Sequence, residues 1–96
     1  MTEKEKIGNK LKELREKIPS SDYNKDHISQ QELADKSIGV TKHLIGTIER
    51  GEANPTLDKM ILVAKSLNLE KVNLLGVEID VDKFFKEWEK EHKSKS

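Results

Sequence analysis

Cysteine is absent from this sequence of 96 residues, which excludes a disulfide framework and a thiolate metal site. Proline occurs twice and glycine five times, so few positions interrupt regular secondary structure. No apolar run approaches the length of a membrane span or of a signal-peptide core, and we therefore expect a cytoplasmic protein. With 33% hydrophobic and 38% charged residues, the composition predicts one small helical domain with a well-solvated surface.

Features of catalytic sites are missing as well. His27, His43 and His92 are far apart in the sequence and lack the HExxH spacing of a zinc site. There is no glycine-rich phosphate loop, and the acidic residues are interleaved with lysine, as on solvated helix faces. The sequence therefore predicts a protein that is not an enzyme, with no catalytic residue, metal ion or cofactor.

A net charge of one sign is also missing, because 18 basic residues balance 18 acidic residues. Nucleic-acid-binding domains are usually basic, so this balance is the strongest compositional argument against such a function. The distribution is nevertheless uneven. The first 18 residues contain six basic and four acidic side chains, and the last 19 contain five and six. A local basic face is therefore compatible with a net charge of zero.

Two short amphipathic segments lie between residues 28 and 55. In the second, Val40, Leu44 and Ile48 recur every four residues, which predicts a helix from Lys42 to Arg50 with one apolar face. The first predicts a helix over residues 30–36. The expected boundaries are a Ser29–Glu32 capping box, Gly39 in the turn, Thr41 as the second N-cap, and Gly51 and Pro55 beyond the second helix.

Helices this short need other elements to cover their apolar faces, and the flanking sequence predicts three more helices. These run over residues 4–17, ended by Pro19; over residues 57–67, capped by Thr56 and ended by Asn68; and over residues 70–75, ended by Gly76.

The end of the chain follows a different pattern. Val77, Ile79 and Val81 alternate with acidic residues, which predicts a short strand-like segment. Phe84, Phe85 and Trp88 then recur at helical spacing. Because aromatic side chains bury large areas, we expect this helix to pack rather than to remain in solvent. The predicted fold is all-α, with five helices over residues 1–76 and a C-terminal extension over residues 77–96.

The central motif resembles the helix-turn-helix of the phage-repressor family, the Cro and Xre type. The resemblance extends from Ile7 to about Leu75 and departs from the family pattern at a longer link over residues 19–27 and at one extra residue near Ser37 in the turn. That extra residue would either lengthen the first helix of the motif or widen the turn, and it leaves the crossing angle of the two helices open. The matching positions are Gln30, Leu33, Ala34, Gly39, Val40, Ile45, Ile48, Glu49, Gly51 and Pro55.

The resemblance implies a sequence-specific transcriptional regulator, expected to be a repressor, that binds double-stranded DNA as a homodimer. Its recognition helix, from Lys42 to Arg50, would enter the major groove, where base edges present distinct donors, acceptors and methyl groups. The expected base contacts are Lys42, His43, Leu44, Gly46 and Thr47. The expected phosphate contacts are Gln30, Thr41, Arg50 and Asn54. The family pattern also implies a structural ion pair between Arg15 and Glu49.

The link over residues 19–27 is polar and turn-rich, and Tyr23 and His27 are its only residues with rings. We interpret it as a surface loop, with Tyr23 on the edge of the core. The alternative is an extra contact to the DNA backbone or to a protein partner.

The dimer interface is expected at the end of the chain, either as paired strands over residues 77–81 or as an aromatic face across the two-fold axis. Packing of that face onto its own domain is an equal alternative. A second class of function is a protein-interaction module, such as an antitoxin or adaptor, that binds its partner through the aromatic tail. The expected interface residues are Val72, Leu75, Val77, Ile79, Val81, Phe85 and Trp88.

Overall fold

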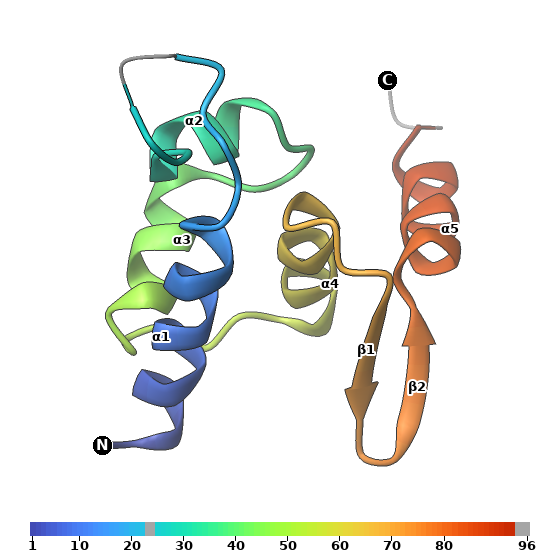
Figure 1. The fold of residues 1–96 in the computed structure, drawn as a ribbon. Helices are drawn as coiled ribbons and strands as arrows, with labels where there is room; N and C mark the ends of the chain where they lie inside the picture. Colours follow the sequence, from blue (N-terminus) through green and yellow to red (C-terminus); the bar gives the residue numbers. More distant parts are fainter. Residues whose placement is uncertain (23–24, 94–96) are drawn as a thin grey trace.

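The computed structural model describes residues 1–22 and 25–93, so the prediction for Tyr23 lies outside the described residues. Figure 1 shows α4 between the α1–α3 group and a hairpin that leads into α5. None of the described helices is long and apolar enough to cross a membrane. In chain order the elements are α1 (Glu3–Arg15), α2 (Gln30–Asp35), α3 (Lys42–Glu49), α4 (Leu57–Ser66), β1 (Lys71–Leu74), β2 (Val77–Asp80) and α5 (Val81–Lys93).

The first four helices lie where the sequence predicts them, with boundaries that differ by at most two residues. Thr41 and Thr56 cap α3 and α4 as expected, since each hydroxyl accepts a hydrogen bond from a backbone N–H three residues later. The apolar faces of the four helices meet in one core, to which Ile28, just before α2, also belongs. This core includes Leu11, Ile28, Leu33, Ile45, Ile48 and Leu62.

The prediction of a helix over residues 70–75 is wrong. Most of this segment forms β1, which pairs antiparallel with β2. Val72 lies opposite Ile79 and Leu74 opposite Val77. Leu75 and Gly76 both have positive φ angles, 53° and 80°, as a two-residue hairpin turn with primed geometry requires. A leucine rarely adopts this conformation, so the turn carries no common sequence signal. The fold is therefore mostly helical with a two-stranded sheet, rather than purely all-α.

The strand predicted over residues 77–81 and the aromatic helix after it are present as β2 and α5. Phe85 and Trp88 are half-buried and pack against the main core, and Val81 is completely buried in a second cluster with Ile61 and Ala64. Of the two alternatives for the aromatic face, the structure thus has it packed on its own domain. Val81 is wrong as an interface residue, since no part of it reaches the surface.

Gly8, on α1, lies against the backbone at the end of α3. A Cβ atom at this position would be 2.3 Å from the carbonyl oxygen of Ile48 and 2.7 Å from that of Glu49. Both atoms belong to backbone, so only glycine allows this approach. The contact fixes the position of the end of α3 along the axis of α1.

Candidate nucleic-acid interface

The N-terminus of α2 is capped by Ser29, whose hydroxyl accepts the Glu32 N–H at 3.0 Å. The reciprocal half of the predicted capping box is absent. The Glu32 carboxylate instead accepts hydrogen bonds from the Ser20 hydroxyl at 2.6 Å and from the Ser21 N–H at 2.8 Å. The bonds from Ser20 and Ser21 lower the pKa of Glu32 to about 2. Glu32 therefore fastens the start of the 19–27 loop to α2.

The turn between α2 and α3 contains Ser37, because α2 ends at Asp35. The Ser37 hydroxyl donates to the Leu33 carbonyl oxygen, and Gly39 has a φ angle of 75°. The side chain of Lys59, on α4, donates to the Gly39 carbonyl oxygen at 3.1 Å. The additional residue therefore lies in the turn and does not lengthen α2.

Arg15 and Glu49 form the predicted ion pair, which joins α1 to the end of α3. The Arg15 Nε lies 2.7 Å from the Glu49 Oε2, and the two side chains are only 7% and 6% exposed. Arg15 also donates to the Ile28 carbonyl oxygen at 2.9 Å. Its hydrogen bonds to Glu49 raise the pKa of the Arg15 guanidinium group, which therefore keeps its charge in the interior.

The same carboxylate orients a residue of the expected DNA surface. The Gln30 side-chain amide donates to the Glu49 Oε1 at 3.0 Å. Its amide oxygen lies over Gly46, where an added Cβ would be 3.3 Å from it. The ion pair in the core thus holds Gln30, at the start of α2, against the middle of α3.

A shallow cavity of about 290 Å³ lies between α2 and α3, and we call it the α3 cavity. Gly46 itself is buried. An added Cβ at this glycine would meet the side chains of Gln30 and Arg50, so its missing side chain leaves the space open. The cavity is lined by Gln30, Lys42, His43, Gly46 and Arg50.

The expected base contacts differ in exposure. Lys42 and His43 are exposed on the first turn of α3. Leu44 is half-buried and packs against the core. The Thr47 side chain is half-buried, and its hydroxyl donates to the Leu44 carbonyl oxygen at 2.9 Å. Lys42 and His43 are therefore the exposed members of the predicted set.

The expected phosphate contacts are not all gathered in one place. Gln30 and Arg50 line the α3 cavity, and the Arg50 side chain also forms an ion pair with Glu52 at 3.0 Å. Thr41 is exposed while its hydroxyl caps α3. Asn54 is exposed and lines a different cavity, beside Gly51 and Pro55.

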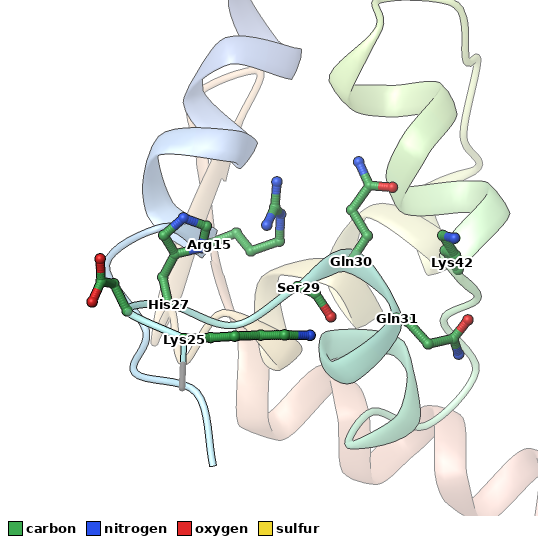
Figure 2. A pocket seen from close by; sticks show the side chains of 8 residues that line it. Arg15, Lys25, His27, Ser29, Gln30, Gln31 and Lys42 are labelled. Carbon is green, nitrogen blue, oxygen red and sulfur yellow. The ribbon is translucent and has the colours of Figure 1, made fainter. Parts of the chain in front are cut away.

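One cation near this surface is absent from the predicted contacts. Lys25, in the loop over residues 19–27, lies beside α2 in a second cavity of about 540 Å³ (Figure 2). This cavity, the loop cavity, is lined by Arg15, residues 25–27, residues 29–31 and Lys42. The available signal was a lysine a few residues before a helix that is expected to face DNA.

Comparison with known proteins agrees with this arrangement. A helix-turn-helix family matches residues 24–80, more than half of the chain. Control protein C.SmaI of Serratia marcescens is 38% identical over 65 residues, which cover 68% of this chain and 76% of that protein. No solved structure gives a significant match. The chain therefore belongs to the helix-turn-helix family of Cro and Xre type, whose members are DNA-binding transcriptional regulators.

Proposed function

We propose that this chain is a sequence-specific repressor that inserts α3 into the major groove of DNA as a homodimer. The main support for this proposal is the orientation of α3. Lys42 and His43 are exposed at its start, while Ile45 and Ile48 fix the opposite face of the helix in the core. A lysine can donate to guanine O6 and N7, and a histidine ring can donate or accept. Bound at a site that overlaps a promoter, such a dimer would block transcription.

The test of base reading is binding-site selection from a randomised duplex pool. We expect Lys42→Ala and His43→Ala each to reduce discrimination at one base position by about 1–3 kcal/mol, because each loses a contact to a base edge. Melting temperatures should stay close to the wild-type value, since both side chains are exposed. Lys90→Ala, which removes the same charge from α5, is the control. A selected sequence that both variants recognise unchanged would contradict the role of α3.

The location of the surface can be tested independently by an amide NMR titration with mixed-sequence duplex DNA. Shifts are expected at residues 29–30, 41–47 and 54, and they should weaken as salt rises from low to physiological concentration. No shifts at low salt would reject DNA binding through this face.

The homodimer is proposed to form through the hairpin tip, because its apolar side chains remain uncovered. Leu74 is 39% exposed, Leu75 is 95% exposed and Val77 is 61% exposed. Two-fold symmetry would match two recognition helices to two half-sites about one DNA turn apart. Removal of everything after Gly76 is no clean test, since Val81 belongs to the core of its own chain.

Leu75→Asn separates the roles of this residue. Asparagine tolerates the left-handed conformation at Leu75, so the free energy of unfolding should rise by about 1 kcal/mol. The dimer should weaken at the same time, because the most exposed apolar side chain of the tip is lost. Sedimentation velocity measures the second effect. A dimer that is not weakened by Leu75→Asn would contradict the hairpin interface. A wild-type protein that is monomeric both in free solution and when bound to DNA would contradict it as well.

The interaction-module alternative has less support. It required an exposed aromatic patch on the tail, whereas Phe85 and Trp88 are half-buried against the main core. The ring of Trp88 also covers the backbone of Gly39, where an added Cβ would lie 3.5 Å from it. These contacts favour a structural role for the aromatic residues.

A further inference from the structure

The loop cavity and the α3 cavity adjoin each other on one side of the molecule. Gln30 and Lys42 line both of them. Figure 2 shows the loop cavity between Arg15 on α1, Gln30 and Gln31 on α2, and the loop that carries Lys25. A duplex bound along α3 would therefore pass close to this loop.

The side chains around the loop cavity leave positive charge uncompensated. Arg15 is neutralised by Glu49, whereas Lys25 and Lys42 have no ion pair among the residues that the structure describes. Asp26 is the one carboxylate among the described residues that line this cavity. Two lysines thus stand against one acid, beside the amide side chains of two glutamines. This combination suits a singly charged anion that accepts hydrogen bonds.

The loop is anchored on both sides of Lys25. Before it, Ser20 and Ser21 are bound to Glu32 on α2. After it, the Ile28 N–H donates to the Ile18 carbonyl oxygen at 2.8 Å and closes the base of the loop. In Figure 2 the Lys25 side chain extends along the beginning of α2 toward Ser29. The charge is therefore presented beside α2 by contacts that do not involve the Lys25 side chain.

We propose that the loop cavity binds a phosphate group of the DNA backbone, with Lys25 as its principal cation. This inference rests on the proposed function and adds to it a contact made by the loop, outside the bases that α3 reads. Lysine serves phosphate as a compact point charge and needs no paired geometry. Such a contact increases affinity for all sequences and helps to orient the duplex without reading bases.

The test is the salt dependence of binding to the selected duplex and to a scrambled duplex, measured by fluorescence anisotropy. Each phosphate contact contributes about −0.9 to the slope of log K against log [salt]. Lys25→Ala should therefore make the slope shallower by about 0.9 and lower affinity roughly eightfold at 0.1 M salt, equally for both duplexes. Lys25→Arg should retain the wild-type slope. Lys90→Ala controls for the loss of one positive charge on α5, outside the lining of this cavity.

The outcomes separate the two proposals. If the wild type binds neither duplex at low salt, the proposed function fails. If the wild type binds and Lys25→Ala has the same slope as Lys90→Ala, the loop contact alone is wrong. A loss confined to the selected duplex would make Lys25 a base-reading residue and overturn the phosphate assignment. A titration with inorganic phosphate tests a free anion instead: amide shifts around Lys25, with an unchanged DNA slope in Lys25→Ala, would also overturn it.

Discussion

Replacement of Glu49 with alanine is expected to lower the free energy of unfolding by about 3–5 kcal/mol. The substitution removes the carboxylate partner of the Arg15 guanidinium, which is 7% exposed. The hydrogen bond from Arg15 to the Ile28 carbonyl oxygen remains, but it does not compensate the charge. Domains of this size have total stabilities of only about 5–15 kcal/mol, so the variant should be close to unfolding. Urea unfolding followed by far-UV circular dichroism measures the change.

Two further variants make this result specific. Glu13→Ala removes an exposed carboxylate of α1 that pairs with Lys10 and Lys17, and it should cost about 0.5 kcal/mol or less. The double variant Arg15→Met with Glu49→Leu should recover much of the loss, because no unpaired charge remains buried. A cost for Glu49→Ala no larger than that for Glu13→Ala would show that the ion pair does not hold α1 to α3.

The double variant also bears on DNA binding. Gln30 donates to Glu49 at 3.0 Å, so a leucine at position 49 releases the Gln30 side chain while the fold is kept. Weaker DNA binding by a stably folded double variant would therefore assign the ion pair a second role, in orienting a phosphate contact.

Gly8→Ala is expected to destabilise the protein by about 3 kcal/mol, although alanine is normally the better helix residue by about 1 kcal/mol. The added Cβ would lie 2.3 Å from the Ile48 carbonyl oxygen, so α1 and α3 must separate. Since α3 carries Lys42 and His43, DNA affinity should also fall. Thermal unfolding and anisotropy measure the two effects.

Gly46→Ala is the matched control for this prediction. Its added Cβ would be 3.1 Å from Nη1 of Arg50 and 3.3 Å from the amide oxygen of Gln30, both at the ends of side chains that can shift. Its stability should therefore be unchanged or higher, by up to about 1 kcal/mol. A Gly8→Ala protein that is also more stable than the wild type would contradict the close approach of the two backbones.

Local patterns determined much of this fold. The four-residue spacing of Val40, Leu44 and Ile48 and the caps at Thr41 and Thr56 place helices correctly, because each depends on neighbours within one or two turns. The ion pair between Arg15 and Glu49 came from the family resemblance, since nothing local indicates a contact across 34 positions.

Other features depend on contacts that no local pattern encodes. Residues 71–74 form a strand because Leu75 accepts a left-handed conformation and β2 lies within reach of pairing. The Glu32 carboxylate accepts hydrogen bonds from Ser20 and Ser21, and not from the backbone N–H of Ser29, because the loop returns to α2. Because periodicity and capping are local, the sequence by itself determined the positions of α1 to α5, although it also predicted a helix over residues 70–75, where the structure has a strand. The tertiary structure decided that the aromatic tail covers its own core and that the loop presents Lys25, since burial depends on which distant surface a side chain meets.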